Sequence, residues 1–218
     1  MNDYKRWYYT AKAKRTVQVL KEKKYDAVIV ENLEEAKKLV LELIPEGSSV
    51  AMGGSVTLNA MDMISTIRNG NYKFFDRFDP NLTFKEEVEV YRQGMLADYF
   101  LSSTNAITED GMLVNVDCSG NRAASMIFGP KHVIVVAGFN KIVKNLDEAL
   151  KRLKEIAPMN CKRLKGHNVA PCVQNGECTG GVGCNIKQRM CNYISIVEHG
   201  GKFEGRFKVI IVLDEVGF

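Results

Sequence analysis

The sequence lacks long apolar runs, and none reaches the roughly 20 residues that a membrane-spanning helix needs. Residues 1–10 are polar and aromatic, so we expect no secretory signal peptide and place the protein in the cytoplasm. The sequence also has no HExxH pair, no Walker loop, no GxGxxG fingerprint and no recognisable serine or cysteine triad. These absences exclude a membrane span and the common zinc-protease, P-loop and dinucleotide-binding motifs.

The charge of the chain is nearly balanced, with 30 Lys and Arg against 26 Asp and Glu and a formal net charge of +4. This excess is too small to predict a nucleic-acid partner. It is concentrated in residues 1–24, where Ala13, Val17 and Leu20 form an apolar stripe at helical spacing. We therefore expect an N-terminal helix over residues 1–24 with a packed stripe and a solvated basic face. Contact of that face with a membrane surface or a polyanion is the alternative.

Apolar, β-rich segments alternate with helical patterns along most of the chain. Asn32, Thr83 and Asn145 each precede a helical pattern with a glutamate three residues later, as in a capping box. Strands are expected at residues 25–30, 49–52, 99–103, 132–138 and 208–214, and helices at residues 33–44, 56–68, 83–93 and 145–157. This alternation is typical of parallel βαβ units. We therefore predict an α/β fold with an open, mostly parallel sheet flanked by helices, in which residues 25–218 form one domain.

A glycine-rich turn, Gly53-Gly54-Ser55, separates a predicted strand from a predicted helix. The free backbone N–H groups and the dipole of a helix start favour an anion, and glycine lets a ligand approach the backbone. Ligands of open parallel sheets bind off the carboxyl ends of the strands. These three residues are therefore predicted to bind a ligand. The alternative is a tight turn in which Ser55 caps the helix.

A second group of polar residues surrounds a predicted hairpin, whose short strands at residues 106–108 and 112–116 are joined by Asp110-Gly111. Arg122, near a helix start, is a candidate clamp for a carboxylate or phosphate, and Glu109 or Asp110 is a candidate base or nucleophile. The alternatives are a simple turn at Asp110-Gly111 and a structural ion pair for Arg122. The predicted ligand-binding residues of this group are Thr104, Asn105, Gly111, Asn115, Asp117, Gly120, Asn121 and Arg122.

Four cysteines, Cys172, Cys178, Cys184 and Cys191, fall in an irregular segment at residues 160–192. In a reducing compartment such a cluster indicates a metal more than disulfides. Four thiolates suit either tetrahedral zinc or an iron–sulfur cluster, including the 4Fe-4S type. A metal would also stabilise a segment that has little apolar core of its own. Free thiols without metal and disulfides remain the alternatives.

Several segments of the chain resemble the lactate-utilisation (LUD) domain family. The most specific is ITEDGMLVNVDCSGNRAASMIFGPKHVIVVAGFNKIV at residues 107–143. The strand and turn VAMGGSVTL, the terminal VIIVLDEVGF and the cysteine-rich segment beginning PCVQNGEC are similar to the same family. The resemblance extends over residues 5–218.

The resemblance implies a fold similar to the sugar-phosphate isomerase and CoA-transferase superfamily. The DG…N…GNR pattern also resembles the ligand-site segment of methylthioribose-phosphate isomerase and its initiation-factor relatives. That likeness implies a site lined by Asp110, Gly111, Asn115, Gly120, Asn121 and Arg122. Some LUD proteins belong to an iron–sulfur system that oxidises lactate, which implies a cluster on the four cysteines.

The chain departs from the family pattern at two places. Residues 179–183 separate two cysteines that the family spaces as C-x2-C, and Cys118 stands where glycine is expected. Three functions remain open: an accessory or redox subunit in iron–sulfur-dependent oxidation of lactate or a related 2-hydroxy acid, an isomerase- or transferase-type enzyme with a structural zinc, and a sensor. The expected partners are a small anionic or phosphorylated metabolite and other lactate-oxidation subunits, with a homodimer as an open option.

Overall fold

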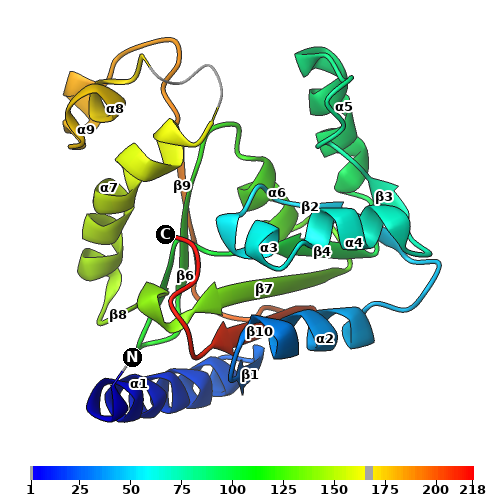
Figure 1. Cartoon of the computed structure of the whole chain (residues 1–218), viewed down its shortest axis with the longest axis vertical. Helices are drawn as coiled ribbons and strands as arrows, with labels where there is room; N and C mark the ends of the chain where they lie inside the picture. The colour runs from blue at the N-terminus through cyan, green and yellow to red at the C-terminus, as the bar shows by residue number, and fades with distance from the viewer. Residues whose placement is uncertain (1, 165–168) are drawn as a thin grey trace.

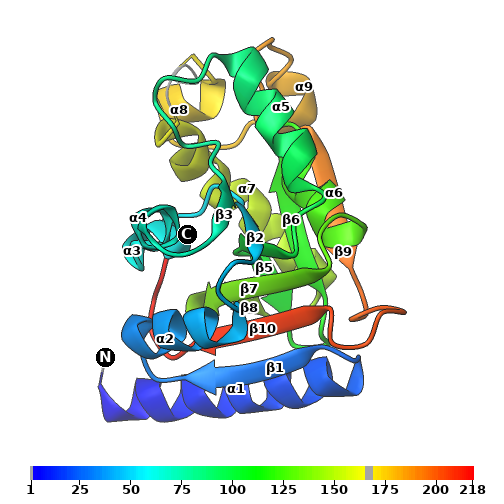
Figure 2. The same cartoon turned by 90° about the vertical axis from the view of Figure 1, so that its right-hand side faces the viewer.

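The computed structural model describes residues 2–164 and 169–218. Its larger sheet has six strands, all parallel, in the order β1-β10-β7-β4-β2-β3 (Figure 1 and Figure 2). These strands are β1 (Asp26–Val30), β2 (Ser49–Met52), β3 (Lys73–Phe75), β4 (Tyr99–Ser102), β7 (His132–Gly138) and β10 (Phe207–Val212). The predicted α/β class and the mostly parallel sheet are therefore confirmed.

Helices cover both faces of the larger sheet. Successive residues of a strand point to opposite faces, so neighbours in one strand join different apolar clusters. In β7, Val133 and Val135 join an apolar cluster with α1, which lies below the sheet in Figure 1. Ile134 and Val136 join a second cluster with α2, α3 and α4. Both faces of HVIVVAG are therefore buried, as its continuous apolar sequence predicts. The covering helices are α1 (Asp3–Glu22), α2 (Leu33–Leu43), α3 (Val56–Ala60) and α4 (Met63–Asn69).

A smaller sheet has four strands in the order β8-β5-β6-β9. Its strands are β5 (Ala106–Thr108), β6 (Leu113–Asp117), β8 (Ile142–Val143) and β9 (Tyr193–Val197). β5 and β6 form the predicted hairpin, and Gly111 has the positive φ, 84°, that side chains other than glycine adopt reluctantly. β9, which the sequence analysis did not identify, pairs antiparallel with β6. Helix α7 (Leu146–Lys162) packs on this sheet through Ala149 and Leu153.

Two helices differ from the prediction. The single helix expected at residues 56–68 is divided into α3 and α4 by Asp62, which has a left-handed backbone with φ 50°. The break allows Met61 and Met63 both to be buried, whereas residues two apart in a continuous helix face different sides. Helix α7 continues to Lys162 instead of ending near residue 157. The remaining helices are α5 (Phe84–Gly94), α6 (Asn121–Ile127), α8 (Pro171–Asn175) and α9 (Gly180–Gly183).

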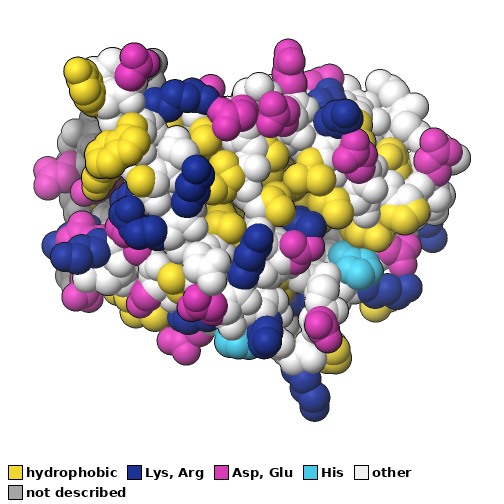
Figure 3. Space-filling view, turned by 90° about the horizontal axis from the view of Figure 1, so that it is seen from below, with side chains coloured by type: hydrophobic (Ala, Val, Ile, Leu, Met, Phe, Trp, Pro, Cys, Tyr) yellow, Lys and Arg dark blue, Asp and Glu magenta, His cyan; other side chains and the backbone are white. Residues whose placement is uncertain are grey.

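Helix α1 buries Ala13, Val17 and Leu20 against the sheet, as the apolar stripe predicts. On the underside of the molecule, basic, acidic and hydrophobic side chains are interspersed (Figure 3). Within residues 2–164 and 169–218, no helix combines the length and the apolar character that a bilayer crossing requires.

Candidate functional site

A cavity of about 570 Å³ lies at the carboxyl ends of three strands of the larger sheet. The turn after β2 contributes Gly54 and Ser55, the loop after β4 contributes Ser103 and Thr104, and the turn after β7 contributes Lys141. Helix α5, the start of α6 and the end of α7 complete the walls. Loops that follow different strands meet here because parallel strands end at the same edge, which is where open α/β sheets bind ligands.

The structure brings together most of the ligand-binding residues that the sequence suggests. Those that line the cavity are Gly54, Ser55, Thr104, Asn105, Asp117, Asn121 and Arg122. Those that do not are Gly53, Gly111, Asn115 and Gly120. Gly111 closes the hairpin against Val19 of α1, and the buried amide of Asn115 faces Met126.

Glu109 and Asp110, the candidate acid–base residues, do not line the cavity. β5 carries the chain from the cavity to the hairpin turn beside α1. There the carboxylate of Glu109 lies 3.6 Å from Lys12 Nζ and 3.7 Å from Arg15 Nη2. The geometry therefore gives these two acids no contact with a ligand in the cavity, and it gives Glu109 a role in holding α1.

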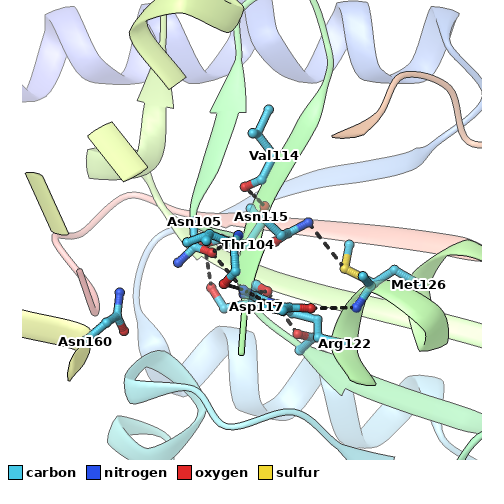
Figure 4. A network of polar contacts seen from close by, with 12 residues as sticks. Thr104, Asn105, Val114, Asn115, Asp117, Arg122, Met126 and Asn160 are labelled. Carbon is cyan, nitrogen blue, oxygen red and sulfur yellow. Dashed lines mark hydrogen bonds and ion pairs between the residues drawn. The ribbon is translucent and has the colours of Figure 1, made fainter. Parts of the chain in front are cut away.

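Arg122 joins two walls of the cavity (Figure 4). Its Nη2 donates to Asp117 Oδ1 at 2.6 Å and to the side-chain oxygen of Asn105 at 2.7 Å. Its Nη1 donates to the carbonyl of Ser103 at 3.3 Å. The other carboxylate oxygen of Asp117 accepts from the Ala123 backbone N–H at 2.7 Å. The guanidinium is thus engaged by protein acceptors, so the structural ion pair considered as the alternative is present.

Arg77 closes the side of the cavity next to α5. Its Nη1 lies 3.1 Å from Glu87 Oε1 and 2.8 Å from the hydroxyl of Tyr91. A Cβ on Gly54 would lie 2.5 Å from Arg77 Nη2, so glycine at this position makes room for a guanidinium. Ser55 also has its alternative role, because its hydroxyl accepts the backbone N–H of Leu58 and caps α3.

Lys141 is the most informative of the cavity residues that the sequence analysis missed, which also include Arg77, Ser103 and Arg163. Its side chain is buried, with 4% of the residue exposed, and Nζ donates to Thr57 Oγ1 at 3.2 Å and to Ser103 Oγ at 3.0 Å. In the part of the chain that the structure describes, no acidic group pairs with it. Burial, and then the charges of nearby arginines, lower the pKa of Lys141 to about 7. Its position after a predicted central strand, at the ligand-binding edge, was the signal available in the sequence.

The charges around the cavity do not balance. Its two acidic side chains, Asp117 and Glu87, are each paired with an arginine. Of the four basic side chains that line the cavity, Lys141 and Arg163 have no carboxylate partner among the described residues. The cavity therefore presents uncompensated positive charge, which favours a negatively charged ligand.

Cysteine thiols lie beside the same cavity. Cys161, on the last turn of α7, packs in a small apolar cluster with Cys172, and both Cys161 and Cys191 line the cavity. The influence of the Cys161 thiol lowers the pKa of Cys191 to about 7. Burial, and then the charge of Cys172, raise the pKa of Cys184, while Cys178 has a smaller effect on it.

The thiols fit zinc or an iron–sulfur cluster by donor chemistry, because both prefer thiolate ligands. All six cysteines are free, so the disulfide alternative is not present. Within the described residues, no three Cys, His, Asp or Glu side chains are already arranged around one point as ligands of an ion. A metal would therefore require side-chain rotation in this segment.

The comparisons with known proteins agree with this fold. The sequence model of the LUD domain family matches residues 13–212. A solved structure of a DUF162 family protein from Deinococcus radiodurans is similar, with 13% sequence identity and a TM-score of 0.55 over 94% of this chain and 98% of that one. At that identity the likeness concerns the fold alone. No curated protein sequence matches the chain. Because the family match extends over most of the sequence, this protein belongs to the LUD domain family.

Proposed function

We propose that this protein binds a small anionic metabolite, a carboxylate or a phosphate ester, in the cavity at the carboxyl edge of the larger sheet. The observation that carries the proposal is Lys141, a buried amine whose hydrogen-bond partners are two hydroxyl groups. Taking a charge out of water without an opposite charge costs several kcal/mol. An anionic ligand would supply the missing negative charge, and Arg163 lies on the same cavity to assist.

The walls of the cavity suit a polar ligand of metabolite size. Its volume of about 570 Å³ lies within the range of small-molecule sites. Ser103 and Thr57 fix the direction of the Lys141 amine, while Thr104 and Asn121 add neutral polar groups for hydroxyl or carbonyl oxygens. A sensor and an isomerase- or transferase-type enzyme would both need this binding step. A turnover assay on each bound metabolite separates them.

Calorimetric titration tests the proposal with inorganic phosphate, lactate and pyruvate as probes at pH 6.5. At least one probe should bind the wild-type protein, and Lys141→Met should weaken its binding about 10- to 100-fold, the scale of a hydrogen bond to a charged group. The matched control is Lys144→Met, because Lys144 is exposed three residues away and does not line the cavity. Equal affinities of the Lys141→Met and wild-type proteins would refute the proposal.

A second candidate function is an accessory or redox role in the oxidation of lactate or a related 2-hydroxy acid. The observation that favours it is that Cys161 and Cys191 line the same cavity as Lys141. Cys172, Cys178, Cys184 and Cys191, the set suggested by the sequence, would hold an iron–sulfur cluster, which would supply electron transfer when bound. A cytoplasmic location would suit this role, because that compartment is reducing and keeps cysteine thiols free to bind metal.

Anaerobic purification followed by iron, sulfide and zinc analysis tests this second role. A brown protein with iron and sulfide in comparable amounts is expected for the redox function. Stoichiometric zinc in a colourless protein would reject it and leave the cysteine segment with a structural metal.

A further inference from the structure

The buried amine of Lys141 has a hydroxyl partner that faces the cavity. Lys141 Nζ lies 3.0 Å from Ser103 Oγ and 3.2 Å from Thr57 Oγ1. Ser103 lines the cavity, whereas Thr57 does not. Ser103 and Lys141 are both buried, so bulk water has little access to either side chain. A serine hydroxyl that is hydrogen-bonded to a buried amine beside a ligand cavity has the arrangement of a serine–lysine pair, in which the amine activates the hydroxyl.

We propose that Ser103 is the nucleophile and Lys141 the general base of a hydrolase that cleaves carboxylic esters with a small acyl group in this cavity. The proposal rests on the proposed function, in which the same cavity binds a small anion. Hydrolysis of such an ester releases a carboxylate, which is the kind of anion that the charged form of Lys141 would bind. The cavity volume of about 570 Å³ is large enough for an ester of metabolite size.

The Ser103 hydroxyl is placed to donate its proton to the amine. Its other hydrogen bond within the described residues goes to the Thr104 carbonyl at 3.4 Å, which is long for a hydroxyl donor. The Ser103 carbonyl accepts from Arg122 Nη1 at 3.3 Å, so the backbone that carries the hydroxyl is held. A Cβ on Gly217 would lie 3.2 Å from Lys141 Nζ, so the backbone of Gly217 packs against the amine. The pair is therefore fixed by its surroundings while Ser103 faces the cavity.

The charges around Lys141 suit a general base at neutral pH. Burial lowers its pKa to about 7, with smaller contributions from Arg152 and Arg163 of α7 and from Arg122 of α6. A base whose pKa is near the working pH is present in its neutral form and can still return the proton. The positive charge of these arginines also favours the negatively charged oxygen that forms when the hydroxyl attacks a carbonyl.

The reaction balances with water as the second reactant. Neutral Lys141 takes the hydroxyl proton of Ser103 while Oγ forms a bond to the ester carbonyl carbon. The bond from that carbon to the alcohol oxygen then breaks, and the alcohol leaves with the proton from Lys141 Nζ. In the second half, Lys141 takes a proton from water as the water oxygen attacks the acyl group. The bond to Ser103 Oγ breaks, the serine regains its proton from Nζ, and the carboxylic acid is released.

Acylation of the full chain by p-nitrophenyl acetate tests the proposal. Peptide mass spectrometry should find an acetyl group on Ser103 of the wild-type protein, and hydroxylamine should remove it, as it removes an ester but not an amide. The rate of acetylation at Ser103 should rise with pH up to about 7, as Lys141 loses its proton, and then level off. Lys141→Met should lower this rate about 100-fold or more, the scale of a lost general base. The control Ser125→Ala should keep the wild-type rate, because Ser125 is buried but does not line the cavity.

Three results would overturn the proposal: wild-type protein without acetyl on Ser103, acetyl on Lys141 in its place, or an unchanged rate in Lys141→Met. Circular dichroism of each variant separates a lost base from a lost fold, and the wild-type mapping needs no variant. Titration with phosphate, lactate and pyruvate keeps the two proposals apart. Wild-type protein that binds one of these anions but is not acetylated on Ser103 would refute the ester hydrolysis alone, whereas wild-type protein that binds none would refute the proposed function.

Discussion

Two walls of one cavity use positive charge in different ways. On the wall made by β6 and α6, Arg122 is held by Asp117, Asn105 and the Ser103 carbonyl. On the wall made by the turn after β7, the partners of Lys141 within residues 2–164 and 169–218 are two hydroxyl groups. The first cation builds the site, and the second stays available to a ligand. A basic residue beside a cavity therefore does not identify an anion site until its protein partners are known.

The largest expected effect is the loss of the Arg122 clamp. Arg122→Ala leaves Asp117 buried without its partner, so the free energy of unfolding should fall by about 3–5 kcal/mol. Urea denaturation at pH 7 measures it. Arg163→Ala is the control, because Arg163 lines the same cavity without a carboxylate partner among the described residues and should cost less than about 1 kcal/mol. Equal losses of stability in the two variants would show that Arg122 stabilises the fold no more than Arg163 does.

Replacing Lys141 should change the free energy of unfolding in the opposite direction, toward greater stability. Its pKa of about 7 in the fold lies below the ordinary 10.5, so the unfolded chain binds more protons between these values and wild-type stability rises with pH there. The cost of the buried charge is therefore fullest below pH 7. Lys141→Met should raise the free energy of unfolding by about 1–3 kcal/mol at pH 6.5 and by less at pH 9. A variant that is less stable than wild type at pH 6.5 would indicate a structural role for Lys141.

A smaller loss of stability is expected from a substitution at Gly54, which lies against the Arg77 guanidinium. Gly54→Ala places a methyl group within the space of the Arg77 guanidinium, which Glu87 and Tyr91 hold, and should cost about 1 kcal/mol. A double-mutant cycle isolates the contact, since Gly54→Ala should cost almost nothing in an Arg77→Ala background. Additive losses would mean that the strain arises elsewhere in the turn.

The smallest effect should follow Glu109→Gln. Its ion pairs with Lys12 and Arg15 are partly exposed, and such pairs contribute about 0.2–1 kcal/mol. Affinity for the anionic probe should not change, because Glu109 does not line the cavity. A large loss of affinity in this variant would restore Glu109 as a site residue and would contradict the separation of hairpin and cavity.

Much of the fold was predictable because it depends on local signals. The apolar run HVIVVAG forms β7 over the predicted residues, and Asn32, Thr83 and Asn145 accept the backbone N–H bonds of helix caps. β9 was missed, because its pairing with β6 is a contact between segments far apart in the chain. The division between α3 and α4 was missed because the burial of Met61 and Met63 on one core decides it, and neither proline nor glycine marks the break.

The candidate site likewise has features that the sequence predicts and features that it does not. The glycine turn, the GNR segment and the strand ends were visible in the sequence, because ligand-binding loops follow parallel strands. The sequence by itself determined the α/β class and the edge of the sheet that carries the site. Only the tertiary structure decided that Arg122 is clamped, that buried Lys141 has no acidic partner among the described residues and that Cys161 packs against Cys172. The reason is that hydrogen-bond partners and desolvation come from neighbours in space, and distant segments supply them.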